Sequence, residues 1–259
     1  MEQLIDLKDG DKLAYIDTGE MNGFPVLIQH GLIASISDVQ LFTKLIENQV
    51  RLISIARPGY GRSSPILMNN IGEWGEIVEV LVNHLNLDLF DIFGISSGAP
   101  YSYAIGHHFP KRARNIFILS GIPALFEQHI LSLWPFPVDK DASLEVLEKL
   151  AFDLFFSNLT DEDRANQDIK DSMMNQCFGI AQDLKLRCLD WGFRLSDIFQ
   201  GVHIRHSRSD ESVPYSTAKM TAAMFPNCIF ESRQNDPHFS QEVLDDFILT
   251  VMNPYYTKT

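Results

Sequence analysis

Residues 90–98 read FDIFGISSG, an apolar run that leads directly into a serine flanked by two glycines. The run Phe90–Phe93 is typical of a buried strand, and residues 97–108 have the pattern of a helix that ends before Pro110. Glycines on both sides of Ser96 permit the tight turn that joins such a strand to such a helix. This context favours a nucleophilic serine, raised at the carboxyl ends of the strands.

This segment has two other interpretations. A glycine-rich strand-to-helix turn can carry a serine that is only structural, and the pentapeptide alone does not exclude this. The preceding strand and the following helix favour the catalytic interpretation. Ser97 is a second hydroxyl, but its frame would place Ile95 and Ala99 where the glycines belong, so Ser96 is the predicted nucleophile.

Short apolar runs and longer helical stretches alternate over most of the chain. Strands are predicted at 13–16, 25–29, 50–55, 90–93, 116–119, 202–204 and 229–230, and helices at 38–48, 71–85, 97–108 and 239–252. Near-continuous apolar runs indicate strands that are covered on both faces. The alternation therefore predicts an α/β fold, with a mostly parallel sheet, helices on both faces and right-handed crossovers.

One segment, from Pro123 to Ile198, breaks the alternation. It contains no convincing strand and has helical periodicity around 144–156 and 169–189. Because it lies between two predicted strands, we expect a helical cap inserted into a core made of residues 1–122 and 199–259. Its large apolar residues are expected mostly to pack the cap and in a few cases to line a pocket: Phe126, Leu133, Trp134, Phe136, Phe152, Phe155, Phe156, Met173, Met174 and Phe178.

The net charge of −13, from 34 acidic and 21 basic residues, argues against nucleic acid or an anionic membrane as a partner. No apolar run approaches the ~20 residues that a membrane-spanning helix needs, so no membrane insertion is expected. The start of the chain does not resemble a signal peptide, and the three cysteines form no CxxC motif for zinc or redox chemistry. These features predict a cytoplasmic protein with a small-molecule substrate; they leave its oligomeric state open.

A serine nucleophile needs a base, and the chain has eight histidines. His238 lies between the last predicted strand and the last predicted helix, in a loop at the same edge of the sheet as Ser96. The others lie on helical stretches or strands, or, like His30, beside a glycine that suggests another role. A loop histidine can also be merely solvated, but its position at this edge favours His238 as the general base.

The base in turn needs an acceptor that fixes its tautomer. Asp210 follows the predicted strand that ends near His206, and it is the predicted acid; alone it would be interpreted as a turn-capping residue.

The developing oxyanion needs amide donors. The amides of Ser97 and Leu32 are the candidates, because Gly31 lets the main chain approach closely, although His30-Gly31 alone is more typical of an ordinary strand-end turn.

Over nearly its full length the chain resembles the α/β-hydrolase superfamily, in its capped, esterase-like branch. The residues that carry the resemblance, in order along the chain, are His30-Gly31, Arg57–Ser63, Gly94–Gly98, Asp210 with Val213-Pro214, and His238-Phe239. The order Ser96, Asp210, His238 is that of this fold. The resemblance implies an eight-stranded sheet, a helical cap after the sixth strand and no cofactor, and no metal site is expected.

Some features depart from the family pattern. Ser207 replaces a glycine common before the acid loop, Pro237 stands where glycine often precedes the histidine, and the oxyanion segment lacks the HGGG of some lipases. Ser96 also excludes the branches that use an aspartate nucleophile.

The leading hypothesis is a hydrolase of small or apolar acyl esters that acts through an acyl-enzyme. A C–C bond hydrolase, a perhydrolase, an amidase and a ligand receptor that does not turn over substrate remain as alternatives.

Overall fold

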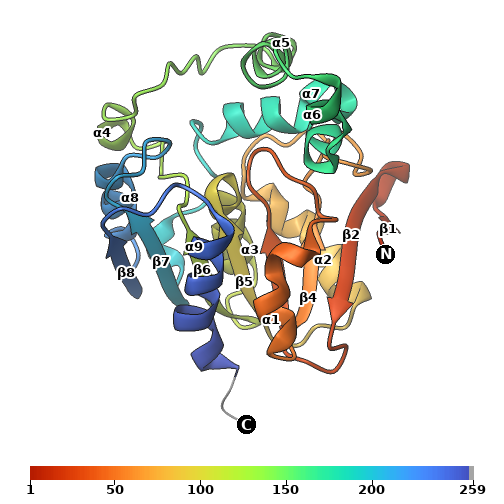
Figure 1. The fold of residues 1–259 in the computed structure, drawn as a ribbon, viewed down its shortest axis with the longest axis vertical. Helices are drawn as coiled ribbons and strands as arrows, with labels where there is room; N and C mark the ends of the chain where they lie inside the picture. The colour runs from red at the N-terminus through yellow and green to blue at the C-terminus, as the bar shows by residue number, and fades with distance from the viewer. Residues whose placement is uncertain (257–259) are drawn as a thin grey trace.

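Eight strands form one sheet in the computed structural model, which describes residues 1–256 (Figure 1). The strands are β1 (Gln3–Asp6), β2 (Lys12–Gly19), β3 (Pro25–Gln29), β4 (Arg51–Ile55), β5 (Phe90–Ile95), β6 (Ala113–Leu119), β7 (Gly201–Ser207) and β8 (Cys228–Arg233). Their order is β1-β2-β4-β3-β5-β6-β7-β8. The strands from β3 to β8 pair in parallel, whereas β2 pairs antiparallel with both of its neighbours, β1 and β4, so that β2 alone is reversed. This confirms the predicted mostly parallel, eight-stranded sheet.

Alternate residues of the central strands face two separate apolar layers. In β5, Ile92 belongs to the layer that includes α2 (Glu73–His84) and α3 (Ala99–His108), whereas Phe93 belongs to the layer of α1 (Thr43–Glu47) and α9 (Gln241–Phe247). Both faces of the sheet are therefore covered, as the continuous apolar runs predict. Figure 1 shows α1 and α9 on the near side of the sheet.

Four helices lie between β6 and β7: α4 (Gln128–Leu131), α5 (Leu144–Phe155), α6 (Asp161–Ala165) and α7 (Gln167–Leu186). The segment 123–198 contains no strand, in agreement with the sequence pattern. Figure 1 shows α5, α6 and α7 gathered at the end of the sheet to which the parallel strands point. The helical backbone of α7 is interrupted at residues 174–177. We call residues 123–198 the insertion; its status as a separate cap domain remains a prediction.

Outside the insertion, the sequence patterns did not predict the strand β1 or the α-helix α8 (Tyr215–Ala222); within it, they did not predict the short helices α4 and α6. The predicted helix at 38–48 is a 3₁₀ turn, Val39–Phe42, followed by the short helix α1. After α9 the chain continues as a π-helical turn, Ile248–Met252, within the predicted 239–252. In the described part of the chain, no helix combines the length and the apolar character that crossing a membrane requires.

Candidate active site

Ser96 stands at the turn between β5 and α3, with a left-handed φ of 51°. A non-glycine residue in this region is strained and persists only where the surrounding structure fixes it. The flanking glycines allow that turn: a Cβ on Gly94 would lie 2.2 Å from Ser102 Oγ, and one on Gly98 would lie 2.1 Å from Gln29 O. The two glycines of the motif are therefore required by the close approach of their neighbours.

The three predicted triad residues meet although they lie far apart in the sequence. Nε2 of His238 is 2.9 Å from Oγ of Ser96, and Nδ1 of His238 is 2.7 Å from Oδ2 of Asp210. Each residue lies in the loop after a different parallel strand, β5, β7 and β8, so the shared strand direction brings all three to one edge of the sheet. The geometry suits a proton that moves from the serine hydroxyl to the imidazole.

The Asp210 carboxylate is fully buried and has several donors. Its Oδ1 accepts the amides of Ser212 and Val213, each at 2.9 Å. Burial by itself raises the pKa of Asp210, but the hydrogen bonds from His238 and the Val213 amide outweigh it, so that the pKa lies below its ordinary value. An ionised carboxylate is therefore held against the imidazole.

His206 is a second histidine beside this carboxylate, and no sequence motif indicates a role for it. Its Nε2 lies 2.9 Å from Val213 O and 3.3 Å from Asp210 Oδ2, and its side chain is fully buried. Burial lowers the pKa of His206, so the ring is neutral at neutral pH. His206 therefore packs against Asp210 as an uncharged ring, and its Nε2 hydrogen-bonds Val213 O. Its place four residues before the acid was the one signal available in the sequence.

The two candidate oxyanion donors lie on either side of Ser96. The Ser97 amide is in the turn Ser96–Gly98, at the start of the helical segment, where the first amides have no acceptor within the helix. Gly31 lies beside Ser96, at ordinary contact distance: a Cβ built on it would meet only Ile95 O and Ser96 Cβ, both at 4.0 Å. Within residues 1–256 the Leu32 amide donates no hydrogen bond. It is therefore a donor without a partner in the described residues.

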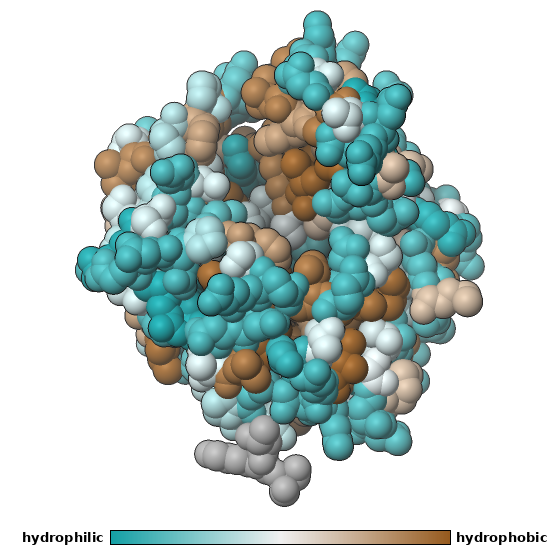
Figure 2. Space-filling view, in the orientation of Figure 1, coloured by the Kyte–Doolittle hydropathy of each residue, from teal (hydrophilic) through white to brown (hydrophobic). Residues whose placement is uncertain are grey.

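The surface above this edge of the sheet is hollowed, as Figure 2 shows between the inserted helices and the body of the molecule. Hydrophobic side chains line its upper wall. Leu32 and Ile33, in the loop after β3, and Phe155 of α5 pack against the same apolar cluster, so the insertion contributes to the packing beside this loop.

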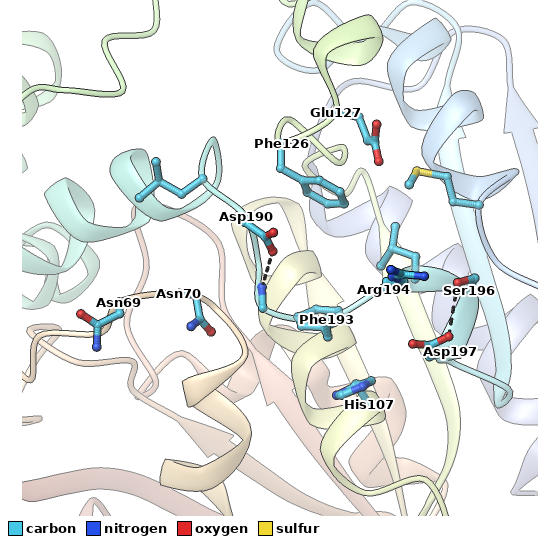
Figure 3. Close-up of a pocket in the computed structure, with 14 residues that line it drawn as sticks. Asn69, Asn70, His107, Phe126, Glu127, Asp190, Phe193, Arg194, Ser196 and Asp197 are labelled. Atoms are coloured by element: carbon cyan, nitrogen blue, oxygen red, sulfur yellow. Dashed lines mark hydrogen bonds between the residues drawn. The ribbon is translucent and has the colours of Figure 1, made fainter.

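A second cavity, of about 930 Å³, lies apart from the triad (Figure 3). Its walls come from the start of α2, the end of α3 and the segment after α7, and include Asn70, His107, Phe126 and Arg194. Figure 3 shows two hydrogen bonds among these residues: Asp190 accepts one from the main chain beside Phe193, and Ser196 donates one to Asp197. These polar groups are therefore already paired. None of the predicted site residues lines this cavity.

No protein-family model matches the chain. A curated relative, the uncharacterized hydrolase YcgS of Bacillus subtilis (strain 168), is 30% identical over 114 residues; this match covers 44% of the chain and only 39% of that relative. Among solved structures, an esterase of Exiguobacterium antarcticum is 18% identical, with a TM-score of 0.75 over 96% of this chain and 98% of that one. MGS-M2, an alpha/beta hydrolase enzyme from a deep-sea metagenome library, is 16% identical, with a TM-score of 0.72 over 99% and 98% of the two chains.

Proposed function

We propose, from the premise that this chain has the α/β-hydrolase fold, that it is a serine hydrolase of small or apolar carboxylic esters. Ser96 is the proposed nucleophile, His238 the general base and acid, and Asp210 the residue that orients His238. The observation that carries the proposal is the hydrogen-bonded chain from Asp210 through His238 to Ser96, at 2.7 and 2.9 Å. Fold alone does not imply function, so the argument rests on this site.

In the first half of the proposed reaction, Ser96 Oγ attacks the ester carbonyl carbon. The hydroxyl proton passes to His238 Nε2 as the Oγ–carbon bond forms, and the carbonyl electrons move onto oxygen. His238 then gives this proton to the leaving alcohol while the carbon–oxygen bond breaks. Asp210 stabilises the charged imidazole without taking its proton. The products are the alcohol and an acyl group on Ser96.

In the second half, water replaces the alcohol. His238 takes a proton from water as its oxygen bonds to the acyl carbon, and returns the proton to Ser96 Oγ as the acyl bond to serine breaks. Both tetrahedral intermediates place negative charge on the former carbonyl oxygen. The amides of Leu32 and Ser97 are the proposed donors to that oxygen, aimed before the reaction at the place where charge develops.

The preference for an apolar acyl group is proposed from the walls of the site. Leu32 and Ile33 lie on the loop beside Ser96, and Phe155 of the insertion packs in the same cluster. The hydrophobic wall of the hollow in Figure 2 adds apolar surface above them. Apolar clefts that contain a few convergent polar groups are typical of small-molecule sites.

The experiment is covalent labelling with a fluorophosphonate, followed by a panel of p-nitrophenyl esters, lactones and amides. We expect the label on Ser96, and we expect Ser96→Ala to lower turnover by about 10⁴-fold or more while the protein stays folded. Ser97→Ala is the matched control, because it keeps the Ser97 amide and should keep both labelling and turnover. A label on Ser97 would overturn the assignment of the nucleophile.

The panel also tests the alternatives. Cleavage of amides in preference to esters would replace the ester proposal with an amidase on the same residues. C–C bonded substrates, and carboxylic acids with hydrogen peroxide, are added to the panel, and their preferred turnover would indicate a C–C bond hydrolase or a perhydrolase. Stoichiometric binding of an ester without release of alcohol would indicate a ligand receptor and overturn the enzymatic proposal.

A further inference from the structure

A buried charged cluster joins the insertion to the loop beside Ser96. Arg57, after β4, and Asp183, on α7, are 1% and 4% exposed, and Arg57 Nη2 lies 2.7 Å from Asp183 Oδ2. The Tyr60 hydroxyl is 2.9 Å from the same oxygen, and the Tyr101 hydroxyl donates to Oδ1 at 2.6 Å. A buried carboxylate thus has one cation and two hydroxyls as partners, which offsets the cost of its burial.

The same side chains hold three consecutive main-chain carbonyls. Arg57 Nη1 donates to His30 O at 2.6 Å, and its Nη2 donates to Gly31 O at 2.8 Å. Nδ1 of His30 also donates to Gly31 O, at 2.8 Å. The Tyr60 hydroxyl lies 2.9 Å from Leu32 O as well as from Asp183 Oδ2, and its single proton bonds one of the two at a time. The main chain of residues 30–32 is therefore held by charged and polar groups, although it belongs to a loop.

These hydrogen bonds also fix the direction of the Leu32 N–H. Gly31 C=O and Leu32 N–H belong to one peptide group, and in a trans peptide these two bonds point in opposite directions. Because Arg57 and His30 hold the carbonyl on their side, the Leu32 N–H points away from them. Ser96 lies next to this peptide, 4.0 Å from the place of a Cβ on Gly31.

We propose that Arg57, held in place by Asp183, is a positioning residue that aims the Leu32 amide toward the oxyanion formed at Ser96. Through this pair, helix α7 of the insertion sets the geometry of the oxyanion hole. The inference rests on the proposed function, since the direction of this amide matters only if Ser96 forms tetrahedral adducts. Arg57 and Asp183 act through the main chain, and neither contacts the reacting atoms.

Arginine is suited to this position and lysine is not. The guanidinium is a planar fork whose donors reach two carbonyls and a carboxylate at once, whereas an ammonium group is a single point charge on a flexible stem. Arg57→Lys should therefore keep a positive charge near Asp183 and release at least one carbonyl. Asp183→Asn is the second variant, because it keeps the size of the side chain and leaves an oxygen for a tyrosine hydroxyl.

Arg205→Lys is the matched control. Arg205 is 2% exposed and is paired with Glu231 and Asp246, at 2.8 and 2.7 Å, but it contacts neither residues 30–32 nor Asp183. The control therefore reports what replacing a buried, ion-paired arginine does to folding alone.

The experiment measures kcat, KM and the rate of fluorophosphonate labelling for the wild type and the three variants. Removal of an oxyanion donor costs about 10²–10³-fold in kcat, so a misaimed donor should cost on the order of 10–100-fold, with KM changed by less than about threefold. We expect this loss in Arg57→Lys and Asp183→Asn and not in Arg205→Lys. If Arg57→Lys does not fold, Asp183→Asn alone decides the question.

A comparison of an ester with its thionoester separates positioning from a general loss of structure. Sulfur is the weaker hydrogen-bond acceptor, so an aimed oxyanion hole favours the ester. The ester-to-thionoester ratio of kcat should fall in Arg57→Lys and Asp183→Asn, whereas a purely structural defect would lower both rates equally and overturn the inference. An unlabelled wild type would instead reject the proposed function. A labelled wild type with variants equal to Arg205→Lys would reject only the role of Arg57.

Discussion

His238 is bonded to Asp210, 28 residues away, at 2.7 Å, and not to Asp236, which lies two residues before it. In residues 1–256 the Asp236 carboxylate makes no hydrogen bond or ion pair; only its main-chain carbonyl accepts, from Ser209 at 3.4 Å. We predict that Asp210→Asn lowers kcat by roughly 10⁴-fold, as an amide in this position favours the wrong imidazole tautomer. Steady-state kinetics on the best ester of the panel measure the effect.

Asp236→Asn is the control for this prediction. It removes the same charge from the same loop as His238 without touching the imidazole, so kcat should stay within a few-fold of the wild type. If the two variants exchanged their effects, the acid would have been misassigned, whereas the roles of Ser96 and His238 would still stand.

We predict that substitution by alanine has opposite effects on stability at Gly31 and at Gly98. A methyl on Gly31 would meet only Ile95 O and Ser96 Cβ, at 4.0 Å, and Gly31 has no left-handed φ. Gly31→Ala should therefore fold with nearly unchanged stability but lower kcat/KM, most strongly for bulky acyl groups, because the methyl occupies space beside the nucleophile. Kinetics across acyl chain lengths, together with urea unfolding, measure both effects.

Gly98→Ala is the counterpart. Its Cβ would lie 2.1 Å from Gln29 O, a main-chain atom that cannot move aside cheaply. The variant should lose about 3 kcal/mol or more of unfolding free energy, at the upper end of overpacking costs. A stable Gly98→Ala, or a Gly31→Ala as active as the wild type on every ester, would contradict this account of the turn.

Repeating patterns made much of the fold predictable from the sequence. Continuous apolar runs such as Phe90–Phe93 identify the buried parallel strands, and the motif around Ser96 indicates which sheet edge carries the site. The strand β1 was missed because it is an antiparallel edge strand whose four residues contain only two apolar ones, Leu4 and Ile5, and therefore show no alternation. Helix α8 was missed because its short sequence is polar and its apolar face is narrow.

The cluster around Arg57 was beyond sequence reasoning for a different reason. Asp183 lies on a predicted amphipathic helix, where an acidic residue is ordinarily assigned to the solvent face. Its burial depends on Arg57, which lies 126 residues earlier, and on Tyr60 and Tyr101. No local pattern records a contact over that separation, whereas Ser96, Asp210 and His238 could be matched because each follows a predicted strand.

Stability should fall as the pH drops below about 6.5. Burial lowers the pKa of His30, His203 and His206, so these rings stay neutral in the folded protein while their counterparts in the unfolded chain take up protons near pH 6.5. Their contribution is therefore present above that pH and is lost as the pH falls toward the folded-state values. Each such histidine lowers the unfolding free energy by up to about 1.4 kcal/mol per pH unit.

Urea unfolding at pH 7.5, 6.5 and 5.5 measures this slope. His203→Gln should reduce it, since one of the buried rings is removed; this ring packs on Phe117 and pairs with the Tyr255 hydroxyl at 2.8 Å. His84, which is exposed and makes no side-chain hydrogen bond or ion pair within residues 1–256, provides the control, and His84→Gln should leave the slope unchanged. A stability that is flat or rises from pH 7.5 to 5.5 would contradict the prediction.

The insertion should influence acyl preference through Phe155 and not through Met174. Phe155 is half-buried and packs in the cluster that contains Leu32 and Ile33, beside Ser96, whereas Met174 is 44% exposed and lines a separate cavity with Arg62 and Lys170. Phe155→Ala should therefore open apolar space near the nucleophile and shift the preferred p-nitrophenyl ester toward longer acyl chains. We expect the ratio of kcat/KM between long and short esters to change by about tenfold, the order expected for one or two methylenes in an apolar pocket.

Met174→Ala is the matched control: it removes a similar apolar volume from the same insertion and should leave the chain-length profile unchanged. Equal profiles for the two variants would mean that the insertion shields the site without shaping its acyl pocket, because only contact with the acyl group can discriminate between chain lengths.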